Sequence, residues 1–165
     1  MTDEVDVAED QEHHLVPLGT RLQKAMQLRA DGKDAEATEL LQAILSTDPR
    51  LAEPRLELAH LAAAREDWDE AEAQARMAVD VLRSGGQWTA DVPAEALLSF
   101  SVNLLAEVIY RSLQDSELIF TDRPAFDRRW NEAAGLFVEA LRIDPSNEDA
   151  RYWTTHVQAR GLPEA

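Results

Sequence analysis

The stretch that decides the fold is GKDAEA, residues 32–37, which recurs 34 residues later as EDWDEA over 66–71. A third copy of the second form, WNEA, covers residues 130–133. Similarity at a fixed period is typical of repeat proteins, in which each unit stacks on the next. Apolar residues and an Asp-Pro pair follow the first and third copies at equal distances, namely Leu41, Ile44 and Asp48-Pro49, and Phe137, Ala140 and Asp144-Pro145. Three helices therefore share one template.

Apolar residues recur at helical spacing from residue 18 to residue 83, and strands are hardly signalled. Short polar segments at 31–34, 47–49 and 65–67 each end one helix and allow the next to begin. Asp67 stands three residues before Glu70, which is the spacing of a capping box with Asp in place of the usual hydroxyl residue. The sequence therefore predicts an all-α protein of short, antiparallel helices.

In these motifs the chain resembles the tetratricopeptide repeat (TPR) family over roughly residues 18–160, whose unit is a helix-turn-helix of about 34 residues. Small residues at the helix crossings and a proline that closes the unit carry the resemblance. The crossing positions are Ala25, Ala37, Ala59, Ala71, Ala106 and Ala133. The resemblance implies a TPR-like α-solenoid of three antiparallel helix pairs plus a C-terminal capping helix over 147–160, seven helices in all.

Two insertions near 84–92 and 113–127 depart from the repeat. The first helix of the third pair is expected at 93–112, and 15 extra residues then separate it from the helix that contains Trp130. We expect a polar loop at 114–127, with Trp88 in the other insertion. Large apolar residues in a long loop either pack back onto the protein or anchor a partner. Those in this loop are Leu118, Ile119, Phe120 and Phe126.

The first 14 residues hold many acidic and few large apolar side chains, so we expect a disordered acidic N-terminal tail at 1–14 and a repeat domain at 15–165. Pro17 is expected at the first helical turn, where proline is well tolerated. The formal net charge of −16 disfavours nucleic acid and anionic membranes as partners, since both carry negative charge. The N-terminus does not resemble a secretory signal and no stretch resembles a membrane span, so we expect a cytoplasmic protein.

Catalytic, cofactor-binding and metal-binding residues have no candidates in this sequence. Cysteine is absent, which excludes thiolate ligands and a cysteine nucleophile. The carboxylates fall mostly on outward helical faces, and no glycine-rich phosphate loop or zinc-binding helix motif occurs. His13 and His14 lie in the acidic tail, where a mobile chain pays heavily to organise metal ligands. We therefore expect no enzyme and no cofactor.

The resemblance also implies a concave groove with a mixed apolar and acidic lining. Family members that bind the acidic C-termini of heat-shock chaperones use Lys and Asn where this chain has Leu22 and Met26, so a carboxylate clamp is not expected. An apolar or basic protein segment suits the lining better. Leu56 and Leu104 are expected to pack on neighbouring helices. The groove residues implied are Leu22, Met26, Arg29, Glu53, Leu56, Glu57, His60, Phe100, Asn103, Glu107, Tyr110 and Arg111.

These expectations favour a protein-protein interaction module, an adaptor or chaperone-like scaffold that binds through the groove and the inserted loop. The alternative is a structural subunit that forms a homodimer or joins a larger complex through the apolar loop. The candidate partner-binding residues are Leu22, Met26, Arg29, Glu53, His60, Phe100, Asn103, Glu107, Tyr110, Arg111, Trp88, Leu118 and Phe120.

Overall fold

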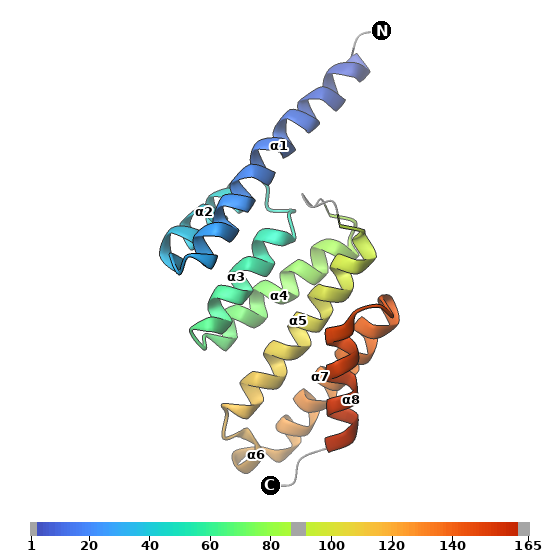
Figure 1. Ribbon diagram of the computed structural model, residues 1–165. Helices are drawn as coiled ribbons and strands as arrows, with labels where there is room; N and C mark the ends of the chain where they lie inside the picture. Colours follow the sequence, from blue (N-terminus) through green and yellow to red (C-terminus); the bar gives the residue numbers. More distant parts are fainter. Residues whose placement is uncertain (1–2, 87–91, 162–165) are drawn as a thin grey trace.

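The computed structural model describes the backbone of residues 3–86 and 92–161, and the side chains from Pro17 onward within these ranges. These residues form helices and connecting turns, with no strand among them, so the all-α prediction is confirmed for the described chain (Figure 1). The helices are α1 Asp3–Ala30, α2 Asp34–Thr47, α3 Glu53–Ala64, α4 Trp68–Arg83, α5 Ala94–Gln114, α6 Leu118–Thr121, α7 Arg123–Ile143 and α8 Glu148–Arg160.

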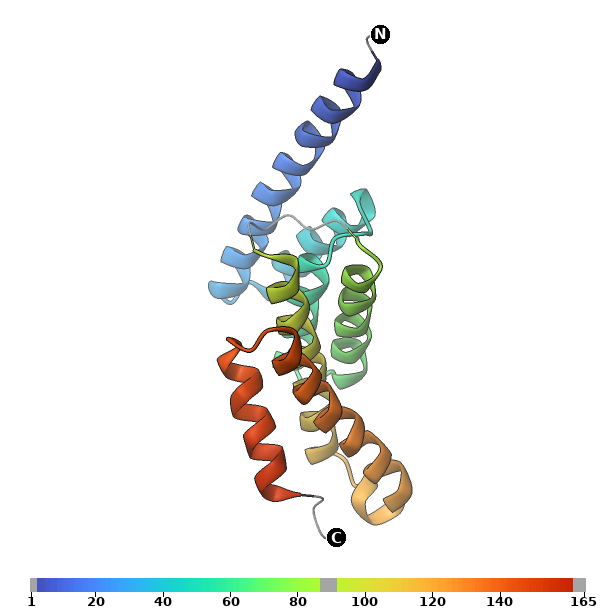
Figure 2. The same cartoon turned by 90° about the vertical axis from the view of Figure 1, so that its right-hand side faces the viewer.

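Helices that are neighbours in the chain also pack together in space. Contacts join α1 with α2, α2 with α3, α3 with α4, and α4 with α5. The helix α6 is only four residues long, and the long helix α5 packs against α7 beyond it. The last helix, α8, packs against α7 and part of α5. The start of α1 lies at one end of the molecule, and α6, which connects α5 to α7, lies at the other (Figure 2).

The six alanines expected at helix crossings are all buried, with exposed fractions of 0–1%. Their small side chains allow close approach of the paired helices, and larger residues fill the space on either side. One apolar cluster joins α1, α2 and the near side of α3, and a second extends from α3 to α8. Phe137 is fully buried, at the template position where Leu41 stands in the first copy.

Three helices begin at a side chain that accepts a hydrogen bond from the backbone of its own first turn. Asp67 Oδ1 accepts from the N–H of Glu70 at 3.3 Å, so the cap predicted at this position is confirmed. Asn147 caps α8 by accepting from the N–H of Ala150 at 3.0 Å. The Asn147 amide also donates to Ser99 Oγ in α5, at 3.0 Å, which ties the start of α8 to the rest of the protein.

The prediction of a loop at 114–127 is wrong. Instead, α5 continues to Gln114 and α7 already begins at Arg123, so residues 113–114 and 123–127 of the insertion lengthen the third helix pair. Pro124 lies in the first turn of α7, where its missing N–H costs nothing, and Asp122 caps this helix by accepting from the N–H of Ala125 at 3.0 Å. The short helix α6 between them makes eight helices in the described residues where seven were expected.

The prediction that the first helix begins at Pro17 is also wrong, since α1 runs from Asp3 and contains Pro17 in its interior. A proline inside a helix removes one backbone hydrogen bond but does not always end the helix. Disorder of residues 1–14 in solution stays a prediction. Trp88 of the other insertion lies outside the described residues.

The helix α5 is apolar on nearly all sides and is long enough to cross a membrane by length and composition alone. Most of this stretch is buried by its neighbours, and twelve of its residues, Ser99, Ser101 and Asn103 among them, belong to the interior. Ser99 and Ser101 each donate a 2.7 Å hydrogen bond to a backbone carbonyl, of Ala140 and Leu97 respectively. A central position in the packing therefore explains the composition of α5 without a lipid.

Candidate functional site

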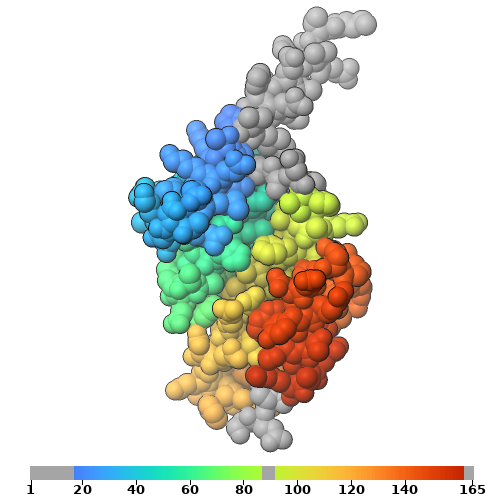
Figure 3. All heavy atoms as spheres, viewed as in Figure 1, coloured from blue at the N-terminus to red at the C-terminus, as the bar shows by residue number. Residues whose placement is uncertain are grey.

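On the face formed by α1, α3, α5 and α8, residues of α3, α4, α5 and α8 line a groove made of two connected hollows, of about 280 Å³ and 500 Å³. In Figure 3 this face is turned to the viewer, with α5 visible between the α3–α4 pair and α8. Both hollows are lined by Ala63, Ala64, Trp68 and Arg111, so they form one continuous surface. We refer to this surface as the groove. The smaller, upper hollow is also lined by His60, Glu107 and Val108. The larger, lower hollow is also lined by Glu66, Gln114, Asp115 and Trp153.

Two of the acidic groups predicted on this face are paired with arginines. Arg29 Nε donates to Glu57 Oε2 at 2.6 Å, which links α1 to α3, and the Glu57 side chain is only 12% exposed. One helix further along, Arg111 pairs with Glu107 at 2.6 Å. Both carboxylates are therefore neutralised within the protein, and the face is less acidic than its sequence suggests.

His60 lies between these two ion pairs and is half-buried. Its ring lies 6.0 Å from the ring of Phe100, centroid to centroid, so the two side chains bridge α3 and α5. Burial lowers the pKa of His60 below its ordinary value, and the charge of Arg29 lowers it further, although Glu57 acts in the opposite direction. The folded protein therefore favours the neutral imidazole, and the charges beside it balance.

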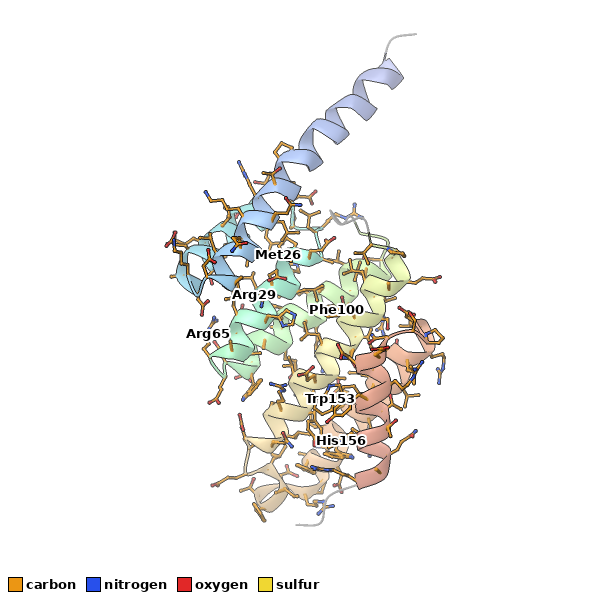
Figure 4. All side chains as sticks on the ribbon, in the orientation of Figure 1. Met26, Arg29, Arg65, Phe100, Trp153 and His156 are labelled. Atoms are coloured by element: carbon orange, nitrogen blue, oxygen red, sulfur yellow. The ribbon has the colours of Figure 1, made fainter. Side chains whose placement is uncertain are left out.

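Large apolar side chains stand exposed beside these balanced charges. Met26 in α1 is 43% exposed and Phe100 in α5 is 41% exposed. Figure 4 shows both on the face turned to the viewer, together with Arg29 from α1 and Trp153 and His156 from α8. An exposed apolar residue alone is normal for a soluble protein, but two such residues on the face that carries the groove make it a candidate binding surface.

Four of the predicted partner-binding residues belong to the protein's interior instead. Leu22, Glu53, Asn103 and Tyr110 are between 3% and 7% exposed, so little of each side chain reaches the surface. The burial of Tyr110 is explained by α8, because the ring of Trp153 lies 5.2 Å from it. Leu56 and Leu104 are buried as expected, at 4% and 7% exposure.

The apolar residues of the expected loop divide between interior and surface. Leu118 and Ile119 are half-buried against the core, and Phe126 is 4% exposed. Phe120 is 75% exposed and is the most exposed large apolar residue described. It borders a third hollow, of about 390 Å³, at the end of the α5–α7 pair.

Sequence reasoning missed the residues that form the lower half of the groove. Trp68 begins α4, and its Nε1 donates to Asp115 Oδ2 at 2.8 Å, which joins the α3–α4 turn to the end of α5. The sequence predicts a loop at Gln114 and Asp115, but Gln114 still belongs to α5. Gln114 lies four residues after Tyr110 and seven after Glu107, which places these residues on one face of a continuous helix. That spacing was a usable signal.

Within the described residues, no group of three or more His, Asp or Glu side chains is arranged to hold a metal ion. Compared with known proteins, the chain matches no family model and no curated sequence.

Proposed function

We propose that this chain is a TPR-like α-solenoid of three stacked helix pairs, α1–α2, α3–α4 and α5–α7, closed by α8. The repeated template supports this arrangement, because its three copies fall on the second helix of each pair and their alanines are all buried at a crossing. Stacked pairs leave a continuous inner face made of their first helices, here α1, α3 and α5. The groove lies along the α3 and α5 part of that face and is completed by Trp68 of α4 and Trp153 of α8.

We further propose that the groove and the exposed surface beside it, from Met26 to Phe100, bind a segment of one protein partner, so that the chain acts in the cytoplasm as an adaptor or chaperone-like scaffold and not as an enzyme. The observation that carries the proposal is the surface from Met26 to Phe100, where exposed apolar side chains flank two internally neutralised ion pairs. Such a surface gains free energy by burying apolar area, and its charges need no new partners.

The chemistry of the groove favours an apolar segment that is neutral or basic. The protein carries a net charge of −16, which disfavours an acidic partner at long range. Amphipathic helices dock into grooves of this kind through a row of apolar residues at helical spacing. We therefore expect an amphipathic helix with few acidic residues.

The test is affinity capture from a lysate of the native host, with the full chain as bait and quantitative mass spectrometry as the readout. Met26→Ala and Phe100→Ala should each reduce the recovered partner several-fold. Met77→Ala is the matched control, because Met77 is also an exposed methionine, at 38%, but lies on α4. Equal recovery by the wild-type chain and all three variants would contradict binding at the surface from Met26 to Phe100.

Homo-oligomerisation is a second candidate, and the outer face of α8 favours it. Tyr152 is 62% exposed there and stacks on His156 with ring centroids 5.9 Å apart. A second copy could cover this ring and extend the stack of helices. Light scattering over a range of concentrations tests the idea, since a mass that stays at 18.5 kDa excludes it.

A further inference from the structure

The hollow of about 390 Å³ at the end of the α5–α7 pair is distinct from the groove, although Gln114 borders both. Its volume is within the range of pockets that hold small organic molecules. The insertion builds it, because the last turn of α5, the helix α6 and the first two turns of α7 supply most of its lining. The α6 end of this pair is seen in Figure 2.

Aromatic rings make up the inner wall of this hollow and are fixed by their own packing. Phe126 and Trp130 are nearly parallel, with an interplanar angle of 19° and a centroid distance of 6.1 Å. The ring centroid of Tyr110 lies 5.3 Å from that of Trp130. All three are at most 6% exposed, so the wall is formed before any ligand arrives.

The outer rim is open and apolar. Ile119 is half-buried, whereas Phe120 exposes 75% of its surface to water. A ligand that enters the hollow would cover part of the Phe120 ring as well as the inner wall. Burial of apolar area on both sides favours a flat ring or a branched aliphatic group.

The polar groups of the hollow favour an acid. Among its described lining residues, Arg160 alone carries a charge. Gln114 Nε2 donates to the Tyr110 hydroxyl at 3.1 Å, which fixes the position of this amide at the rim. A guanidinium group pairs with a carboxylate through two parallel hydrogen bonds, a geometry that an uncharged amide cannot match.

We propose that this hollow binds an apolar ring or branched chain that bears one carboxylate, with the apolar part against Trp130 and Phe126 and the carboxylate on Arg160. Both a free organic acid and the C-terminal residue of a peptide have this chemistry. The inference does not depend on the groove, and its test uses different residues.

The test is isothermal titration of the full chain with indole-3-propionate and with its neutral amide. The acid should bind about tenfold more tightly than the amide, as expected for one charge-assisted pair at a partly exposed site. Arg160→Gln should abolish this difference, whereas Phe120→Ala should weaken both ligands several-fold. Arg142→Gln is the control, because Arg142 is also exposed but lies in the last turn of α7, at the end away from the hollow.

A second arm distinguishes the two sources of the acid. A tripeptide that ends in Phe is titrated with a free and with an amidated C-terminus. Tighter binding of the free peptide than of indole-3-propionate would support the proposal and identify a peptide C-terminus as the ligand, and the reverse order would support a free acid. Equal affinity of acids and amides in the wild-type chain, or no binding of any probe at millimolar concentration, would overturn the proposal.

Discussion

Arg29 of α1 and Glu57 of α3 form an ion pair with an Nε–Oε2 distance of 2.6 Å, and this pair joins the first two helix pairs on the groove side. The two partners differ in exposure, since the Arg29 side chain is 39% exposed and that of Glu57 only 12%. Loss of the arginine would leave a carboxylate that water reaches poorly, whereas loss of the glutamate would leave a cation that water still solvates.

We therefore predict that Arg29→Gln destabilises the protein by about 1–2 kcal/mol, and that Glu57→Gln costs less. The double variant Arg29→Gln/Glu57→Gln should regain most of the loss, because the poorly solvated Glu57 carboxylate is then also removed. Urea denaturation followed by circular dichroism measures all four free energies of unfolding. Arg21→Gln, on the exposed side of the same helix, is the control, and an equal loss there would remove the explanation.

On the opposite side, Glu72 of α4 is the centre of an ion-pair network that joins α4 to α7. Its carboxylate accepts from Arg129 at 2.9 and 2.5 Å and from Arg76 at 2.9 and 2.7 Å, and both arginines also contact Glu132. Burial opposes ionisation of Glu72, but the hydrogen bonds from Arg129 and Arg76 outweigh it and lower the pKa of this carboxyl below 4.5.

A group whose pKa is lowered on folding adds stability above its unfolded pKa, and that stability is lost as the pH falls through its folded pKa. Glu72→Gln should therefore cost about 1–2 kcal/mol at pH 7, and the difference from the wild-type chain should shrink below pH 4. Thermal denaturation at several pH values between 3 and 7 measures both effects. Glu39→Gln, on the exposed face of α2, should show neither.

The positions of the crossing alanines could be predicted from the sequence because they follow a fixed period and because only a small side chain fits there. Ala37, Ala71 and Ala133 are all 0–1% exposed for this reason. The course of 113–127 could not be predicted in the same way, since an insertion has no second copy for comparison. Even so, Asp122 followed by Pro124 is an N-cap with a proline in the first turn, and this local pattern indicates the start of α7.

The candidate site was predicted in part, and the errors have one physical cause. A residue's place on the groove side of its helix follows from periodicity, as it did for Met26 and Phe100, which are exposed there. How deeply it is buried depends on the next helix to pack against it. Tyr110 is 3% exposed because α8 places Trp153 against it, and its own helix gives no signal of that contact.

His60 should make the protein less stable in mild acid. Burial and Arg29 lower its folded pKa below 6.5, although Glu57 opposes them, so the folded state disfavours the proton that the unfolded chain binds. The stability that depends on a neutral His60 is therefore fully present above pH 6.5 and is lost as the pH falls below it. His60→Gln should lose less thermal stability between pH 7.5 and pH 5.5 than the wild-type chain. An NMR titration of the imidazole checks the cause directly, and a midpoint at or above 6.5 would contradict it.

Substitution of two glycines by alanine should change the free energy of unfolding in opposite directions. The N–H of Gly86 donates to the carbonyl of Val81 at 2.7 Å, and a Cβ on Gly86 would lie 2.4 Å from Val81 Cγ1 and 2.7 Å from that carbonyl oxygen. Gly86→Ala should therefore cost about 1–3 kcal/mol, because a carbonyl oxygen of the backbone cannot move aside as a flexible side chain does. Gly135 lies within α7, and a Cβ there would meet nothing within 4 Å. In a helix interior alanine is more favourable than glycine, so Gly135→Ala should stabilise the protein by about 0.5–1 kcal/mol. Urea denaturation of both variants measures the two signs, and a stabilised Gly86→Ala would show that the turn after α4 can relax.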